Sequence, residues 1–261
     1  MRCGEPRVTL LHQGENQRPS TARNRGRDAA RAPWLTVLDA DDFFCAQDRF
    51  ARLLAVAEAE GADFVADNLW KVPEDDPDGP RLPMISGGPI GVQRLDAAGF
   101  VAANLSARHG GRRELGFLKP LMSKAFLEKN RLSYDPGIRL GEDYVLYAQA
   151  IISGAHFVLT DTAGYVAVTR PDSLSGWHPT EAHEHLVRAD TALLARRDLD
   201  RATRRALRAH LIEQRKKWAW RRLIDAKVAT DPVAAAACFW APPAVIDDLL
   251  MRLSQEARSR L

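Results

Sequence analysis

The feature that most constrains the fold is a short apolar run that stops at a group of acidic residues. Residues 34–38 read Trp-Leu-Thr-Val-Leu, and Asp39, Asp41 and Asp42 follow almost directly. A run of this length and composition is typical of a strand buried in a layered sheet. Its carboxylates then lie at the carboxyl end of the strand, where open α/β sheets bind ligands. We therefore expect residues 34–38 to form a central strand that delivers acidic side chains to a cleft.

Carboxylates in this pattern favour a hard metal ion. Two of them one residue apart point the same way and share Mg²⁺ or Mn²⁺, which keeps coordination positions for phosphate oxygens. Without a cation, the clustered charges of Asp39, Asp41 and Asp42 repel one another and cost stability. The alternative is an acidic loop that caps the following helix, with Asp48 in its first turn.

The first two thirds of the chain alternate between short apolar runs and helical patterns, which predicts an α/β fold. We expect further strands at residues 7–12, 63–66, 156–159 and 165–169. We expect helices at residues 21–32, 47–60, 95–105, 123–130 and 141–153, and a loop or irregular hairpin at 71–91. From Glu181 onward the pattern is helical. These signals predict one domain over residues 1–178 and a helical extension over 179–261.

Composition excludes several classes of protein. The three cysteines, Cys3, Cys45 and Cys238, are widely spaced and form no CxxC pair. That spacing argues against a disulfide scaffold or a zinc site and fits a reducing, cytoplasmic setting. No apolar run is long enough to span a membrane, and the N-terminus lacks the features of a secretory signal.

Two helix starts carry charges of opposite sign. Arg23, Arg25 and Arg27 lie near the start of one predicted helix, where arginines and backbone N–H groups suit a diphosphate. Glu142 and Asp143 open another, and a carboxylate held ionised there can take a proton from a hydroxyl. The alternatives are a solvated basic face in the first case and simple complementation of the helix dipole in the second.

Together these motifs resemble glycosyltransferase family 2. The stretch PSTARNRGRDAARAPWLTVLDADDFF is similar to the family's G-P-S-x-A-R-N-x-G segment and its L-D-A-D-D motif. The stretch that begins GFLKPLMSK is similar to the family's k-P-L segment, its G-E-D motif and its R-x-x-S-x-S loop. Order and spacing match over residues 7–176, and the resemblance extends to exopolysaccharide glycosyltransferases of the succinoglycan type.

The resemblance implies a GT-A, Rossmann-like mixed sheet flanked by helices, and a metal-dependent, inverting transfer from a UDP-sugar to a glycan or lipid-linked acceptor. On the donor side it implies that Asp41 contacts Mg²⁺ or Mn²⁺ and that Asp39 lies near the ribose. Asp42 would support both as a further member of the metal site. Arg23 and Asn24 would lie beside the nucleotide.

On the acceptor side the resemblance implies that Asp143 is the catalytic base and that Glu142 orients the acceptor or the base. Arg170, Ser173 and Ser175 would cover the diphosphate. The family's first strand–helix–strand unit, which holds the nucleobase, has no counterpart before residue 7, so we expect an N-terminally truncated fold. The alternative function is therefore a non-catalytic remnant that acts as a binding protein.

The helical extension is strongly basic. Twelve Lys or Arg and four Asp or Glu lie between Arg196 and Lys227, a net charge of +8, and Trp218 and Trp220 interrupt the basic run. Basic residues interleaved with Trp suit an anionic membrane surface, which predicts peripheral contact with the inner face of the cell membrane. The alternative is a helical hairpin that packs its Trp and Leu on the main domain. We expect no nucleic-acid partner.

Overall fold

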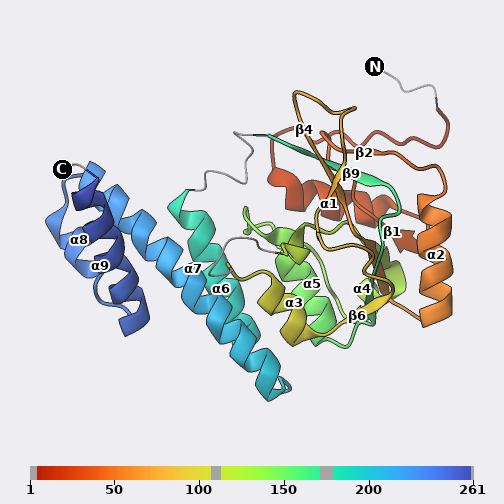
Figure 1. Ribbon diagram of the computed structural model, residues 1–261. Coiled ribbons are helices and arrows are strands. Elements are labelled where there is room, and N and C mark those ends of the chain that lie inside the picture. Colours follow the sequence, from red (N-terminus) through yellow and green to blue (C-terminus); the bar gives the residue numbers. More distant parts are fainter. Residues whose placement is uncertain (1–4, 107–112, 171–178, 260–261) are drawn as a thin grey trace.

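The computed structural model describes residues 5–106, 113–170 and 179–259. Its strands form two mixed sheets, one of five strands in the order β1-β7-β3-β8-β6 and one of four in the order β2-β9-β4-β5 (Figure 1). The larger sheet consists of β1 (Trp34–Leu35), β7 (Leu121–Ser123), β3 (Phe64–Asp67), β8 (Phe157–Thr160) and β6 (Gln93–Leu95). The smaller consists of β2 (Phe43–Phe44), β9 (Tyr165–Thr169), β4 (Trp70–Pro73) and β5 (Leu82–Pro83).

Each sheet contains one parallel pair of strands, and the chain connects the two pairs. β3 and β8 are parallel in the larger sheet, and β4 and β9, which follow them closely in sequence, are parallel in the smaller one. All other neighbours are antiparallel. The chain therefore runs from the larger sheet into the smaller one both after β3 and after β8, and β9 is brought beside β2, in the segment that follows β1.

Helices cover both faces of the larger sheet. In β3, Phe64 and Ala66 belong to the main hydrophobic core, whereas Val65 joins a second core with Leu53 and Ala57 of α2. Successive strand residues point to opposite faces, so both faces of a covered strand are apolar. The helices of this part are α1 (Arg18–Ala29), α2 (Arg49–Glu60), α3 (Ala97–Ala103), the 3₁₀ turn η1 (Leu115–Phe117), α4 (Lys124–Lys129) and α5 (Glu142–Ile152).

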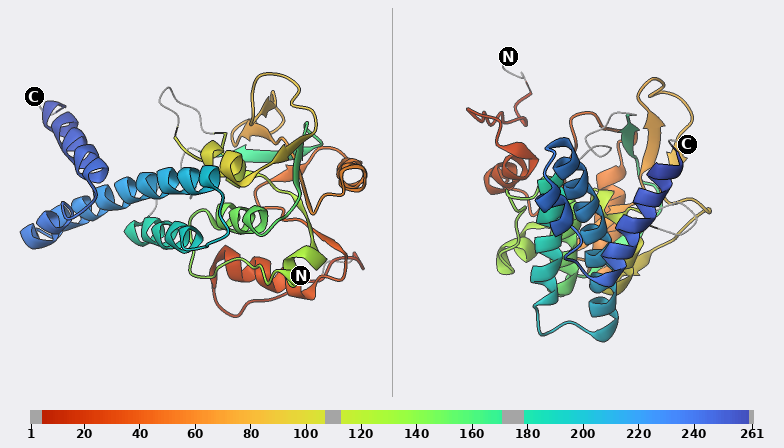
Figure 2. Two further views of the ribbon diagram at one scale, coloured as in Figure 1. Left: turned by 90° about the horizontal axis from the view of Figure 1, so that it is seen from below. Right: turned by 90° about the vertical axis from the view of Figure 1, so that its left-hand side faces the viewer.

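The helical extension has two parts. It consists of α6 (Thr180–Leu194), α7 (Arg201–Val228), α8 (Pro232–Ala237) and α9 (Pro243–Arg258). Leu186 of α6 and Leu207 of α7 belong to the main core, so that core crosses the domain boundary expected at residue 178. The far half of α7 projects away from the sheets and packs with α8 and α9 around a separate small core (Figure 2).

A buried polar network joins the near half of the extension to α5. The Tyr144 hydroxyl donates to Asp190 Oδ1 at 3.2 Å, and His210 Nδ1 lies 2.7 Å from Asp190 Oδ2.

None of the described helices is long and apolar enough to cross a lipid bilayer.

Two expected strands differ from the structure. The run at residues 34–38 contributes only the two residues of β1, which lie at an edge of the sheet, so the prediction of a central strand is wrong. Residues 7–12 form no strand, and Val8 and Leu10 are 52% and 60% exposed. A strand requires a hydrogen-bonding neighbour, and none of the described strands pairs with this segment.

Local chemistry explains smaller differences. α1 begins at Arg18, before the start expected at residue 21, with Pro19 in its first turn. The Ser20 hydroxyl donates to the Ile138 carbonyl oxygen at 3.3 Å. The segment 71–91 does contain a hairpin, formed by β4 and β5. The strands β2, β6 and β7 have two or three residues each, too few to show alternation in the sequence.

Candidate functional site

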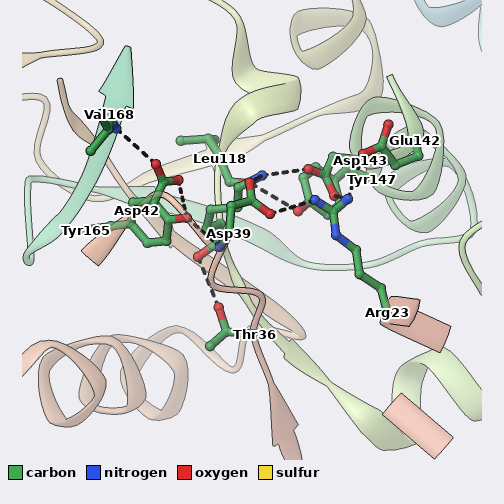
Figure 3. A network of polar contacts seen from close by, with 11 residues as sticks. Arg23, Thr36, Asp39, Asp42, Leu118, Glu142, Asp143, Tyr147, Tyr165 and Val168 are labelled. Carbon is green, nitrogen blue, oxygen red and sulfur yellow. Dashed lines mark hydrogen bonds and ion pairs between the residues drawn. The ribbon is translucent and has the colours of Figure 1, made fainter. Parts of the chain in front are cut away.

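The acidic segment after β1 forms a tight turn in which the Asp42 N–H donates to the Asp39 carbonyl oxygen at 3.1 Å. The turn sends its three carboxylates in different directions. Asp39 points toward α1 and α5, and Asp42 points toward β9 (Figure 3). Asp41 is exposed to solvent. The three side chains therefore meet different neighbours.

Asp42 fastens the turn to β9. Its Oδ2 accepts from the Tyr165 hydroxyl at 2.6 Å, and its Oδ1 accepts from the Val168 N–H at 3.0 Å. The same hydroxyl accepts from the Asp39 N–H at 3.3 Å. Burial raises the pKa of Asp42. Both oxygens of this carboxylate are thus engaged within the protein.

The Gly-Glu-Asp segment opens α5. Gly141 takes a left-handed backbone conformation, with φ of 73°, which lets Glu142 and Asp143 start the helix at once. A Cβ at position 141 would lie 3.1 Å from Leu186 Cδ2. The helix dipole stabilises carboxylates in this first turn. The turn faces Asp39, so the structure brings the two acidic motifs together (Figure 3).

Arg23 of α1 bridges the two motifs. Its Nη2 donates to Asp39 Oδ1 at 2.8 Å, and its Nη1 donates to Glu142 Oε1 at 2.8 Å and to Asp143 Oδ1 at 3.1 Å. The guanidinium carbon also lies 5.3 Å from the centre of the Tyr134 ring. One side chain therefore contacts three candidate site carboxylates.

Asn24, the next residue of α1, has a different environment. Its Nδ2 donates to the Tyr134 carbonyl oxygen at 2.7 Å, and its Oδ1 accepts from the Tyr134 N–H at 3.0 Å. The amide thus fixes α1 to the loop beneath the Arg23 guanidinium. The expected contact between Asn24 and a nucleotide stays a prediction.

Lys119 is a member of the site that sequence reasoning missed. Its Nζ lies 3.0 Å from Asp39 Oδ2 and 2.7 Å from Asp143 Oδ2, and the residue is only 5% exposed. A signal was present in the sequence: this lysine stands in an apolar stretch, Phe-Leu-Lys-Pro-Leu-Met. A lysine in a buried segment needs an acidic partner, because burying an unpaired charge is costly.

Electrostatics bind the cluster together. Two cations, Arg23 and Lys119, stand among the three carboxylates Asp39, Glu142 and Asp143. Burial alone would raise the pKa of Asp39, but the charges of Lys119 and Arg23 outweigh it and hold that pKa below its usual value. Burial raises the pKa of Glu142, and the negative charge of Asp143 adds to the shift.

A buried ion pair supports the cluster from below. Arg49 Nη2 donates to Asp67 Oδ1 at 2.6 Å and to the Lys119 carbonyl oxygen at 2.8 Å. Both side chains of the pair are at most 1% exposed. Asp67 Oδ2 also accepts from the Ala163 N–H at 3.1 Å. This pair was not predicted, since Arg49 reads as a surface residue in the first turn of a helix.

Arg170, at the end of β9, lies on the far side of the acidic turn. Its Nε lies 2.9 Å from Glu74 Oε1, and its Nη1 lies 3.9 Å from Asp41 Oδ2. The structure therefore places Arg170 near Asp41. The expected partners Ser173 and Ser175 lie outside the described residues.

The carboxylates fit one arrangement of a divalent cation better than another. Within the described ranges, no three His, Cys, Asp or Glu residues form a group that could hold a metal ion. Asp39 is engaged by two cations and Asp42 by β9, whereas Asp41 is exposed. Mg²⁺ is often held by one or two carboxylates together with substrate phosphates and water. The residues therefore fit a cation held chiefly by Asp41 and a bound diphosphate, and do not fit a site shared by all three.

Known proteins share the sequence pattern. Residues 2–111 match the sequence model of the family described as Glycosyl transferase family 2. The chain is 38% identical over 226 residues to the succinoglycan biosynthesis protein ExoU of Rhizobium meliloti, which covers 86% of this chain and 64% of that protein. It is 35% identical over 197 residues to ExoO of the same organism, which covers 75% of this chain and 55% of that protein. The chain thus spans less than two thirds of the length of these relatives.

Solved structures share the fold. The crystal structure of Staphylococcus aureus TarS 1-349 in complex with UDP matches with a TM-score of 0.58 and 14% identity, over 90% of this chain and 69% of that one. The complex with UDP-GlcNAc matches with a TM-score of 0.56 and 14% identity, over 85% and 71%. At this identity the likeness concerns the fold alone. The sequence motifs, the match of residues 2–111 to the family's sequence model and the two relatives all support membership of glycosyltransferase family 2.

Proposed function

We propose that the chain transfers a sugar from a UDP-sugar to a hydroxyl of a glycan or lipid-linked acceptor in exopolysaccharide synthesis. The observation that carries this proposal is the cluster that joins Asp39, after β1, to Glu142 and Asp143, at the start of α5. Donor and proton acceptor must meet in one cleft for a direct transfer. Both relatives are succinoglycan biosynthesis proteins, which supports the pathway, and UDP in the TarS complex supports the donor class.

On the acceptor side, Asp143 is the general base. It accepts the proton of the acceptor hydroxyl while that oxygen attacks the anomeric carbon, and the nucleotide diphosphate leaves from the opposite face. A single displacement of this kind inverts the configuration of the sugar. Asp143 Oδ1 accepts a hydrogen bond from Arg23, which also donates to Glu142. Glu142 thereby helps to hold the guanidinium beside the base.

On the donor side, Asp41 is the residue that would hold a Mg²⁺ or Mn²⁺ ion beside the diphosphate. When bound, the ion supplies positive charge that offsets the charge of the leaving group. Asp39 lies near the ribose, and Asp42 holds the acidic turn against β9. Arg170, 3.9 Å from Asp41, contacts the diphosphate from the other side.

The basic extension places the enzyme at its acceptor. We assign it to the cytoplasm, at the inner face of the cell membrane, because Arg201, Arg205 and Arg208 recur on one exposed side of α7. These residues are spaced by four and three, so they form a stripe along the helix. An anionic lipid surface attracts such a stripe.

The test measures UDP release from a panel of UDP-sugars with added Mn²⁺, and UDP binding by calorimetry. The proposal expects metal-dependent release with at least one sugar and saturable binding of UDP. A folded chain that neither binds UDP nor releases it from any UDP-sugar would contradict the proposal and support the non-catalytic alternative.

A further inference from the structure

Lys119 is a buried cation at the junction of the two acidic motifs. Its Nζ contacts Asp39 Oδ2 and Asp143 Oδ2 at 3.0 and 2.7 Å. We propose that Lys119 is a positioning residue for the transfer: it clamps the proposed base Asp143 to Asp39, and so sets the base at a fixed place relative to the donor. This inference rests on the proposed function for its kinetic consequence, but the clamp itself is a property of the folded chain.

The backbone of Lys119 is fixed in place. Its carbonyl oxygen accepts from Arg49 Nη2 at 2.8 Å and from Thr36 Oγ1 at 3.4 Å. Arg49 is in turn held by Asp67, with both side chains buried. Since the lysine is only 5% exposed, its ammonium group cannot follow a ligand out of the site.

Arg23 differs in this respect. It reaches the cluster from α1, divides its contacts among three carboxylates, and its side chain is 12% exposed. A diphosphate competes with carboxylates for a guanidinium, because both anions accept its paired N–H groups. When a donor draws on Arg23, Lys119 is the cation that stays with Asp39 and Asp143. Without it, the close carboxylates repel one another and separate.

The first experiment tests the clamp without turnover. Thermal unfolding is measured for Lys119→Met, Asp143→Asn and the double variant. Removing the lysine increases the excess of negative charge in the cluster, so we expect a lower midpoint for Lys119→Met and a partly restored midpoint for the double variant. Additive effects would overturn the clamp. If Lys119→Met does not fold, a folded double variant supports the clamp, and a double variant that also fails to fold overturns it.

The second experiment measures positioning. Misplacing a catalytic group by about 1 Å costs on the order of 10²-fold. We therefore expect Lys119→Ala to lower kcat for UDP release from the best UDP-sugar of the panel by about that factor, with KM for the donor nearly unchanged. Added ethylammonium, at matched ionic strength, should restore part of kcat, which a purely structural role would not allow.

Lys124 provides the matched control, because its Nζ donates to the Ala30 carbonyl oxygen away from the cluster. Lys124→Ala should leave kcat unchanged and show no response to ethylammonium. Equal kcat in Lys119→Ala and the wild type would overturn the positioning role. A wild-type chain that consumes no UDP-sugar contradicts the proposed function instead, and the unfolding cycle still decides the clamp.

Discussion

At the scale of single residues, the proposed general base Asp143 is the residue on which the rate of transfer should depend most. Replacing it by Asn keeps the size and shape of the side chain in the first turn of α5 but removes the charge and the proton acceptor. General-base catalysis is worth about 10²–10⁴-fold, so kcat for transfer should fall by that order while UDP affinity is retained. Initial rates of UDP release and calorimetry on the same preparations measure both quantities.

Asp135 offers the control for that change. Its carboxylate is exposed and caps only the local turn, by accepting from the Gly137 N–H at 2.8 Å. Asp135→Asn should behave like the wild type. A variant at Asp143 that keeps its kcat but loses UDP binding would make that residue a donor ligand and not the base.

Asp41 is the residue through which metal dependence should act. Asp41→Asn removes the exposed carboxylate of the turn, so half-maximal UDP release should need at least about tenfold more Mn²⁺, a typical cost of altering the surroundings of a metal. A Mn²⁺ titration measures this. Asp48→Asn, an exposed carboxylate beyond β2, should leave the titration unchanged. An unshifted curve for Asp41→Asn would remove this residue from the metal site.

Part of this cluster could be predicted from residue types in the sequence, and the rest depends on contacts between residues that are far apart in sequence. Arg23, Asp39 and Asp143 stand in motifs whose chemistry is readable, and the structure brings them within hydrogen-bonding distance through one guanidinium. Lys119 and Arg49 were not predicted, because their importance lies in partners across the fold. In the sequence, Asp67 is an ordinary residue at the end of a strand, and its role depends on the Tyr165 N–H of β9, which donates to its carboxylate.

At the scale of elements, the start of α5 depends on one glycine. Gly141→Ala forces a left-handed conformation on a residue with a Cβ and presses that atom against Leu186. The backbone cost is about 1 kcal/mol, and the contact adds to it. Because Glu142 follows directly, kcat should fall together with the midpoint of thermal unfolding.

Gly61 provides a control that separates the backbone cost from the cost of the contact with Leu186. It ends α2 with φ of 60°, but a Cβ there would have no atom within 4 Å. Gly61→Ala should therefore lose a similar amount of stability through the backbone alone and keep its kcat. Equal kcat in both variants would show that the start of α5 does not position the catalytic residues.

A contact between the segment that follows α3 and helix α7 gives the stability of the chain a dependence on pH. Glu213 accepts from the Ser106 N–H and from Lys217 Nζ, at 2.9 and 2.7 Å. Burial alone would raise its pKa, but these partners outweigh it and lower the pKa from 4.5 to about 2. A lowered pKa adds stability above pH 4.5, and that stability is lost as the pH falls toward 2.

Glu213→Gln should remove this contribution. We expect about 1–2 kcal/mol less stability than the wild type at pH 7, after allowance for solvent screening, and a smaller difference near pH 3. Urea unfolding at both values measures it. A difference that grows toward low pH would contradict the assignment.

The same scale shows where sequence patterns are informative. Strong helical periodicity placed α2 and α5 to within two residues, and Gly61 marked the end of α2. The run after Pro33 has the composition of a central strand, but only two of its residues pair with a neighbour. Hydrophobicity reports burial, and it does not report which strands are available for pairing.

At the scale of the whole molecule, the extension is both part of the core and an arm beyond it. Tyr144, next to Asp143, bonds to Asp190 of α6, which in turn contacts His210 of α7. The near half of the extension therefore supports the helix that carries the site. The far half packs with α8 and α9 around Cys238 and Leu249, in a small core separate from the core of the sheets.

The helical extension should bring the enzyme to an anionic membrane through the near half of α7. Arg201, Arg205 and Arg208 are exposed, and none makes an ion pair within the described part of the chain. Each basic residue near an anionic surface contributes about 1 kcal/mol, so replacing all three by Gln should weaken binding to vesicles with anionic lipid on the order of 10²-fold. Cosedimentation with vesicles of phosphatidylcholine and phosphatidylserine, at low and high salt, measures the change.

A second triple variant separates position from net charge. Arg81, Arg94 and Arg131 are exposed and lie on other elements, so replacing them by Gln changes the net charge equally without touching α7. Binding that falls only with the α7 variant, and only for anionic vesicles, supports docking through the stripe. Trp240, 94% exposed on the arm, should add an apolar contact, so Trp240→Ser should weaken binding even at high salt, where the charges are screened. Equal losses in both triple variants would leave only a general attraction of a basic protein for lipid and would remove the α7 stripe as the docking element.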